Sequence, residues 1–200
     1  MNPSRIGIFG GSFDPPHCAH VALVQAAINQ LRLDTLFVIP TGQAWHKSRS
    51  LTPAHHRLAM SQLAFAGESN VNLDDREILR SGPSYTIDTL LSIQAEYPNA
   101  QLFLIIGYDQ ALALKTWHRW QEIVDLAIIC IACRPETLAN KADISDSFAY
   151  IPAYRHLEFA LMPVSSTQIR QEIALKHPVN ALVSDAVLRY IDQHHLYHST

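Results

Sequence analysis

Residues 6–20 read IGIFGGSFDPPHCAH, and this stretch decides the fold. Its first four residues form an apolar run that the glycine pair Gly10-Gly11 closes. After His17, apolar residues recur at intervals of three and four, at Val21, Val24, Ala27, Ile28 and Leu31. A short apolar run closed by glycine is typical of a buried strand, and the later spacing is that of an amphipathic helix. The stretch therefore predicts a strand, a glycine turn and a helix in direct succession.

The alternation of strand and helix continues along the whole chain. Further strands are predicted at 35–39, 71–73, 102–106, 126–132 and 159–162. Helices are predicted at 52–65, with Pro53 as the first helical residue, at 84–97, as short pieces within 110–125, and at 165–176 and 181–194, whereas 136–148 is predicted to be a loop. Apolar strands that alternate with helices form parallel sheets covered on both sides. We therefore expect one α/β domain over residues 1–200, with a doubly wound, mostly parallel sheet and helices on both faces.

The composition argues against several classes of partner. Charged residues make up 16% of the chain and the formal net charge is -3, so no general basic field is available to gather a nucleic-acid polymer. The apolar stretch from Leu126 to Cys133 is far shorter than the roughly 20 residues needed to cross a bilayer. The first residues lead straight into the first strand without an export signal. We expect a cytoplasmic protein that binds neither membrane nor nucleic acid.

The cysteines and the late histidines do not predict a disulfide or a metal site. Cys18, Cys130 and Cys133 are an odd number of thiols, which does not suggest a disulfide framework. Cys130 and Cys133 have the CxxC spacing, but strand alternation sends positions three apart to opposite faces and no second pair completes a zinc site. His194, His195 and His198 are interpreted as a polar helix end. No metal site built from protein ligands is therefore expected.

The glycine corner predicts a phosphate site. Glycine lets backbone N–H groups approach an anion, and the following helix points its positive end to the same place. The spacing is not the G-x-G-x-x-G of dinucleotide-binding turns, which argues against a dehydrogenase, and the lysine of a P-loop is absent. His17 and His20 lie three residues apart at the helix start, so both can reach one substrate. A structural or surface role is the alternative for this pair taken alone.

A second candidate anion site lies near the end of the chain. Three hydroxyl residues, Ser165, Ser166 and Thr167, stand at a predicted helix start, with Arg170 one turn later. A simple helix cap is the alternative interpretation, but a cation is disfavoured near a helix amino terminus unless an anion is present. In a doubly wound sheet, ligands bind beyond the carboxyl ends of the strands. The expected corners are Gly10-Gly11, Pro40-Thr41, Gly107 and Val164-Ser165.

Six ordered segments carry a resemblance to a known family. Residues 10–20 resemble the motif GG[ST]FDPxHxGH, His46-Lys47 resembles the end of a PPHK loop, and residues 84–90 resemble SYTxxTL. Residues 106–109 resemble IGxD, 117–120 resemble WxxW, and 165–170 resemble SSTxIR. Together these segments resemble the HxGH-type nucleotidylyltransferases, which have a Rossmann-like nucleotidyltransferase fold, and most closely the bacterial nicotinate-nucleotide adenylyltransferases.

The resemblance implies a reaction and a role for each matched residue. ATP and nicotinate mononucleotide would give deamido-NAD and pyrophosphate, with Mg²⁺ accompanying the ATP and held mainly by phosphate oxygens and water. The catalytic residues would be His17, His20, Lys47 and Arg170. ATP would be bound by Gly10, Gly11, Ser12, Phe13, Gly107, Asp109, Ser166 and Thr167. Tyr85, Thr86, Trp117 and His118 would bind the acceptor, with Trp117 stacked on the pyridine ring; self-association into a homo-oligomer is left open.

Three positions depart from the family pattern. Ala19 stands where glycine is usual, Ala44-Trp45 replaces Pro-Pro, and Tyr108 stands where a small residue is common, so that it would narrow the ribose site. Core packing is the alternative for Trp117 and Trp120, and capping of the adjacent helix is the alternative for Asp109. The competing functions are a sister adenylyltransferase that acts on nicotinamide mononucleotide or phosphopantetheine, and a nucleotide-binding module without turnover.

Overall fold

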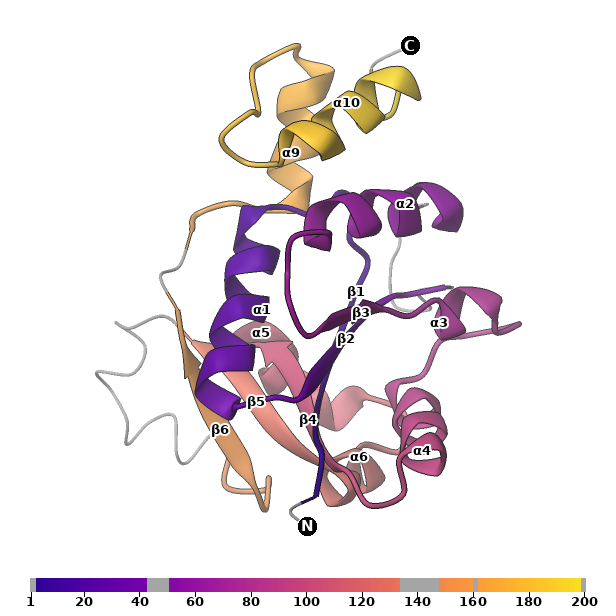
Figure 1. Cartoon of the computed structure of the whole chain (residues 1–200), viewed down its shortest axis with the longest axis vertical. Coiled ribbons are helices and arrows are strands. Elements are labelled where there is room, and N and C mark those ends of the chain that lie inside the picture. Colours follow the sequence, from indigo (N-terminus) through magenta and orange to yellow (C-terminus); the bar gives the residue numbers. More distant parts are fainter. Residues whose placement is uncertain (1–2, 43–50, 134–147, 160–161, 199–200) are drawn as a thin grey trace.

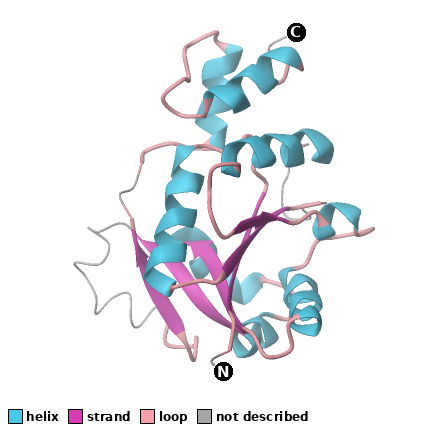
Figure 2. Cartoon of the chain, viewed as in Figure 1, coloured by secondary structure: helices cyan, strands magenta, loops and turns pink. Residues whose placement is uncertain are grey.

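The computed structural model describes residues 3–42, 51–133, 148–159 and 162–198, and it contains one parallel sheet covered by helices on both faces (Figures 1 and 2). The six strands in sheet order are β3 (Val71–Leu73), β2 (Thr35–Pro40), β1 (Arg5–Gly11), β4 (Gln101–Gly107), β5 (Ala127–Cys133) and β6 (Tyr154–Glu158). Every neighbouring pair is parallel. The doubly wound fold class is therefore confirmed, with no antiparallel strand among the six.

The central strands are apolar at successive positions because each of their faces meets a separate core. In β4, Leu102, Leu104 and Ile106 enter one core, whereas Phe103 and Ile105 enter the other. The first core is completed by α4 (Thr86–Glu96), α5 (Tyr108–Leu112), the 3-10 turn η1 (Leu114–Thr116) and α6 (Trp120–Leu126). The second core is completed by α1 (Cys18–Leu31) and by the end of α2 (Ala54–Phe65).

A third, smaller core joins the last two helices to α2. Helices α9 (Ser166–Ala174) and α10 (Asp185–Gln193) bury Ile169, Ile173, Val187 and Ile191 together with Met60 of α2. In Figure 1 these helices lie beside α2 at one end of the molecule. Most of their remaining surface is polar. This small core places the end of the chain next to the loops that follow β1 and β2.

Several predicted boundaries differ from the structure. The last described strand is β6 at Tyr154–Glu158, ahead of the strand predicted at 159–162. Phe159 and Met162 are not in a strand, and residues 160–161 lie outside the described residues. β6 is the edge strand and buries only Leu157 fully, so its polar sequence YRHLE carries little apolar signal. The four-residue helix α3 (Arg76–Leu79) was not predicted because it is too short to show a helical period.

Helix starts also differ by a few residues. Pro53 is the N-cap of α2 rather than its first helical residue. Helix α4 begins at Thr86, two residues after the predicted start. The helix predicted from 181 begins at Asp185, because the Ser184 hydroxyl caps it by accepting a hydrogen bond from the Val187 N–H.

Some predictions are only partly covered by the described residues. Most of the predicted loop 136–148 lies outside them, but its last residue, Phe148, is fully buried in the first core. Cys18 and Cys130 are free thiols, and burial raises the pKa of Cys130 to about 12. Within the described ranges, no cluster of three histidine, cysteine or acidic side chains could hold a metal. No described helix is long and apolar enough to span a bilayer.

Candidate active site

A cavity of about 430 Å³ opens beyond the carboxyl ends of β1 and β4. The strand order places β2 on one side of β1 and β4 on the other, so the connections that leave these strands diverge there. This is the switch point at which doubly wound sheets bind ligands. The predicted site residues that line the cavity are Gly10, Gly11, Ser12, His20, Tyr85, Thr86, Gly107, Trp117 and His118.

The glycine corner forms one wall of this cavity. The Gly11 carbonyl accepts a hydrogen bond of 2.9 Å from the Thr41 N–H, which ties the end of β1 to the end of β2. A Cβ atom on Gly11 would lie 2.9 Å from the Phe13 ring, so glycine is needed for close packing here. The Phe13 ring is 1% exposed and contacts the rings of Phe9 and His20. Phe13 therefore packs under the glycine corner as a core residue and does not line the cavity.

The two histidines have different environments. The backbone N–H of His17 donates a hydrogen bond of 3.1 Å to Nδ1 of His20, and the two imidazole rings stack with their centroids 3.7 Å apart. Because Nδ1 of His20 is an acceptor, a neutral His20 ring carries its proton on Nε2, which makes Nε2 a donor. His20 lines the cavity, whereas His17 lies behind it.

His17 is a buried, neutral histidine. It is 7% exposed, and its Nδ1 atom has no hydrogen-bond partner among the described residues. Burial lowers the pKa of His17 from 6.5 to about 4. At neutral pH the ring is therefore uncharged and can offer one N–H donor but no positive charge.

The late hydroxyl motif docks onto the loop of the first motif. The Ser166 hydroxyl donates to the Pro15 carbonyl at 2.9 Å, and Nη1 of Arg170 donates to the Asp14 carbonyl at 2.6 Å. Ser165 is the cap, because its hydroxyl accepts from the Gln168 N–H. The alternative interpretation as a helix cap thus holds for Ser165. Arg170 also donates to the Thr167 hydroxyl. The guanidinium of Arg170 therefore has hydrogen-bond acceptors within the protein, and a bound anion would be an additional partner.

The start of α4 and the segment after η1 form the opposite wall. Tyr85 is the N-cap residue of α4 and Thr86 is its first residue, and the Tyr85 side chain makes no capping hydrogen bond. The Tyr85 ring lies against the His118 ring, with centroids 4.4 Å apart. Trp117 is partly buried and lines the cavity. This wall combines aromatic faces with the positive end of a helix.

Comparison with known proteins identifies relatives that match nearly the whole chain. A family model described as cytidylyltransferase-like matches residues 8–172. A protein of Albidiferax ferrireducens named "Probable nicotinate-nucleotide adenylyltransferase" is 52% identical over 96% of this chain and 98% of its own length. A protein of the same name from Methylibium petroleiphilum is 44% identical over 98% of this chain and 95% of its own length.

The chain belongs to the nicotinate-nucleotide adenylyltransferase family. The solved structure of Plasmodium falciparum nicotinic acid mononucleotide adenylyltransferase complexed with NaAD superposes with a TM-score of 0.80. It is 22% identical and covers 97% of each chain. This likeness confirms the Rossmann-like nucleotidyltransferase fold.

Some of the family's motif residues do not line the cavity. Ser166 and Arg170 bond the Asp14-Pro15 loop beside it, and Thr167 accepts a hydrogen bond from Arg170. Asp109 is an exposed residue in the first turn of α5. The N-cap residue of α5 is Gly107, and Asp109 is the acidic residue of the first turn, where its charge suits the positive end of the helix. Lys47, with His46 and the Ala44-Trp45 departure, lies outside the described residues.

Two aromatic residues, one from a motif of the nicotinate-nucleotide adenylyltransferases and one that departs from their pattern, pack in the core. Trp120 packs edge-on against Tyr150 and does not line the cavity, so core packing is the right interpretation for Trp120. The Tyr108 ring packs edge-on against the buried Phe148 ring. Since Tyr108 does not line the cavity either, the narrowing expected from this departure is not found.

Sequence reasoning missed a buried arginine that holds the site loops together. Arg57 of α2 is 1% exposed and donates to the carbonyls of Ser12 at 3.0 Å, Thr52 at 2.8 Å and Gly42 at 3.3 Å. It thereby links the glycine corner to the loop after β2. An arginine inside an amphipathic helix gives no local sign of burial, because its partners are backbone groups of other segments.

Proposed function

We propose that this chain transfers the adenylyl group of ATP to nicotinate mononucleotide. A phosphate oxygen of the mononucleotide attacks the α-phosphorus of ATP, and the bond from that phosphorus to the bridging oxygen of the β-phosphate breaks. The products are deamido-NAD and pyrophosphate. The observation that carries the proposal is one cavity with the glycine corner and His20 on one wall and Trp117 and the start of α4 on the other.

The donor end is assigned to the glycine corner and the two motifs that meet there. We assign the backbone N–H groups of the glycine corner and Nε2 of His20 to the phosphates, where donors stabilise the charge that develops during transfer. Arg170, Ser166 and Thr167 are assigned to the leaving pyrophosphate, together with Lys47. The backbone N–H of His17 holds His20 by donating to Nδ1 of His20, and the neutral His17 ring is assigned as a further N–H donor. Gly107 and Asp109 are assigned to the adenosine.

The acceptor end is assigned to the opposite wall. Trp117 and the Tyr85–His118 ring pair offer apolar faces to a pyridine ring. The start of α4 offers backbone N–H donors, the Thr86 hydroxyl and the positive end of the helix. A ring carboxylate is matched by such donors, whereas an amide would bring an NH₂ group that needs an acceptor. This favours the acid over the amide acceptor.

Mg²⁺ is proposed to enter with ATP rather than to reside in the protein. Within the described ranges, no cluster of side chains could hold a metal. Mg²⁺ in such sites is held largely by phosphate oxygens and water, and it neutralises phosphate charge there. A cytoplasmic location belongs to the same proposal, because Cys18 and Cys130 are free thiols, which suit a reducing compartment.

Product analysis by mass tests this proposal. The protein is incubated with ATP, Mg²⁺ and, separately, nicotinate mononucleotide, nicotinamide mononucleotide and phosphopantetheine, while pyrophosphate release is followed. We expect the highest kcat/KM with nicotinate mononucleotide. A higher kcat/KM with another acceptor would identify a sister enzyme. Nucleotide binding without release of pyrophosphate would identify a binding module.

A further inference from the structure

A buried carboxyl group forms part of the cavity wall near the acceptor end. Glu77 of α3 is 8% exposed and lines the cavity. Burial of a carboxylate is costly unless hydrogen bonds compensate for the lost water. Loss of hydration raises the pKa of Glu77, and hydrogen bonds from Thr89 and Thr41 oppose that shift. The group is therefore held by specific partners rather than by solvent.

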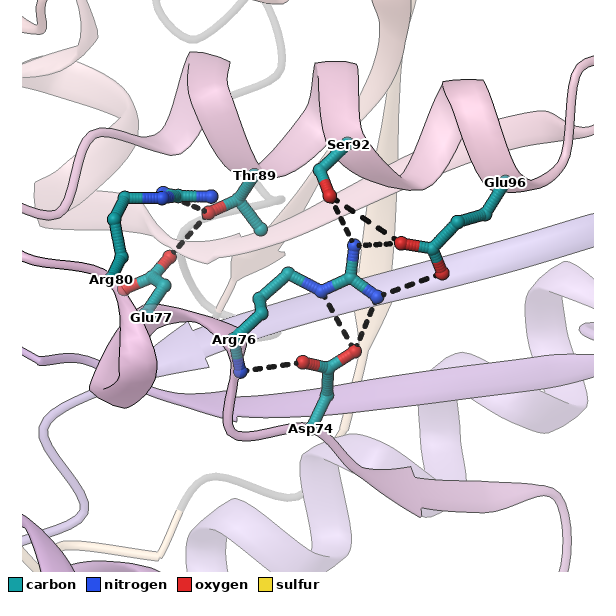
Figure 3. Close-up of polar contacts among 7 residues, drawn as sticks. All are labelled: Asp74, Arg76, Glu77, Arg80, Thr89, Ser92 and Glu96. Carbon is teal, nitrogen blue, oxygen red and sulfur yellow. Dashed lines mark hydrogen bonds and ion pairs between the residues drawn. The ribbon is translucent and has the colours of Figure 1, made fainter.

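The two hydrogen-bond partners of the Glu77 carboxyl come from α4 and from the residue next to β2. The Thr89 hydroxyl of α4 donates to Oε1 of Glu77 at 2.8 Å, and the side chain of Thr41, next to β2, bonds the same carboxyl. Nη1 of Arg80 donates to the Thr89 hydroxyl at 3.3 Å, so the Thr89 proton is left to point at Glu77 (Figure 3). Glu77 thus joins α3, α4 and the end of β2 through bonds that are mostly buried.

The joined elements carry the acceptor residues. Thr89 lies three residues after Thr86, on the same side of α4 and one turn from its start. A second bond joins the segment after β2 to the segment before α4: the Gly42 N–H donates to the Ser84 hydroxyl at 3.2 Å. A Cβ atom on Gly42 would lie 2.1 Å from the Glu77 carbonyl oxygen, so these backbones pack as closely as glycine allows. The place of Thr86 therefore depends on Glu77 and its neighbours.

We propose that Glu77 is a positioning residue for the acceptor: through Thr89 and Thr41 it fixes the first turn of α4 against the end of β2. Tyr85 and Thr86 then present their donors to the mononucleotide in one orientation. This inference rests on the proposed function, because it takes the start of α4 to be the acceptor end. It concerns affinity for the acceptor and not for ATP, because Glu77 bonds the side chain of Thr41, whereas the glycine corner is held by the backbone N–H of Thr41.

A second polar network supplies a matched control. Arg76 of α3 bonds Asp74 at 2.6 Å and Glu96 at 2.9 Å (Figure 3). It therefore also ties α3 to α4, but at the far end of α4. Glu96 is half-exposed and does not line the cavity. Loss of the Glu96 carboxylate therefore weakens the contact between α3 and α4 without changing any residue of the acceptor wall.

The test compares Glu77→Ala, Glu77→Gln and Glu96→Gln by steady-state kinetics and thermal unfolding. We expect Glu77→Ala to raise the KM for nicotinate mononucleotide about tenfold, with an unchanged KM for ATP, since a hydrogen bond to a charged group contributes about that factor. Glu77→Gln keeps an oxygen that accepts from Thr89 and should recover most of the affinity. Glu96→Gln should leave both KM values unchanged.

Each other outcome overturns a stated part of the argument. An unchanged acceptor KM in Glu77→Ala, or the same rise in Glu96→Gln, removes the positioning role. A parallel rise of both KM values shows general loosening instead. If Glu77→Ala does not fold, Thr89→Val decides, because it removes only the hydroxyl and should raise the acceptor KM alone. A wild-type protein that forms no deamido-NAD overturns the proposed function, whereas an active wild type with unaffected variants overturns only this inference.

Discussion

The Ser166 hydroxyl donates a hydrogen bond of 2.9 Å to the Pro15 carbonyl, across 151 positions of the chain. Pro15 lies between the glycine corner and His17, so this bond holds the start of α9 against the loop that follows β1. The neighbouring Ser165 hydroxyl instead caps α9. Two adjacent hydroxyls therefore have separate partners, and their roles can be tested separately.

Ser166→Ala should raise the KM for ATP several-fold, because it loses a bond of about 1 kcal/mol that holds α9 to the phosphate loop. Ser165→Ala should lower the free energy of unfolding by about 1 kcal/mol through loss of the cap, with little change in KM. Steady-state kinetics and urea unfolding of both variants measure these effects. Equal effects on the KM for ATP would refute the division of roles.

His20→Ala should lower kcat by a factor on the order of 100 or more, because a donor placed at a reacting phosphate contributes about 3 kcal/mol. The midpoint of thermal unfolding should change little. His177→Ala is the control, since His177 is an exposed histidine that pairs with Glu172. A fall in kcat of less than about tenfold would contradict the role of His20.

Trp117→Ala should raise the KM for the mononucleotide and leave the KM for ATP unchanged, because Trp117 lines the cavity on the wall proposed for the acceptor. Trp120→Ala removes a nearby indole that packs on Tyr150 instead. It should lower the unfolding temperature with a smaller effect on KM. If Trp117→Ala raises only the KM for ATP, the two ends of the cavity are assigned in reverse.

Gly42→Ala should lower the free energy of unfolding by about 1–3 kcal/mol, because its Cβ meets the Glu77 carbonyl oxygen at 2.1 Å and a backbone atom cannot move aside easily. The KM for the mononucleotide should rise as α3 shifts. Gly67→Ala is the matched control, with no atom within 4 Å of its added Cβ. Urea unfolding that ranks the two variants equally would show that the contact at Gly42 is not tight.

Stability should fall in acid partly through His17. Its pKa is about 4 when folded and 6.5 as the reference, so below pH 6.5 the unfolded chain binds a proton that the folded chain does not. The neutral His17 ring makes its full contribution to the free energy of unfolding above pH 6.5. This contribution decreases as the pH falls and is lost at about pH 4. The free energy of unfolding is measured with urea at pH 7 and at pH 4. Its decrease between the two pH values should be about 3 kcal/mol larger in wild type than in His17→Gln. Parallel losses would show that His17 titrates normally.

The order of elements was readable from the sequence because the signals are local. In residues 6–31, the spacing of apolar residues and the pair Gly10-Gly11 predict a strand, a glycine corner and a helix. The runs in β4 and β5 are apolar on both faces and predicted a covered parallel sheet. Edge strand β6 was misplaced, because an edge strand has no need of a continuous apolar run. Helix α3 was missed because four residues show no period.

The candidate site was readable only in part. The motifs around His20, Thr86 and Trp117 were predicted to bind ligands, and the structure brings them to one cavity. Nothing in the sequence separated the two histidines, because the difference comes from the burial of His17 behind His20. Nor did any pattern mark Arg57 or Glu77. Their partners lie in other segments, and a charged residue in a helix is usually exposed.

The sequence by itself determined the succession of strands and helices, the glycine corner and the residue types available for phosphate, because these depend on spacing along a few turns of chain. Only the tertiary structure decided that Ser166 and Arg170 dock on the Asp14-Pro15 loop, which tautomer His20 adopts, and that Glu77 joins three elements. Those contacts depend on how the cores pack and how much water they exclude, and no local pattern encodes either quantity.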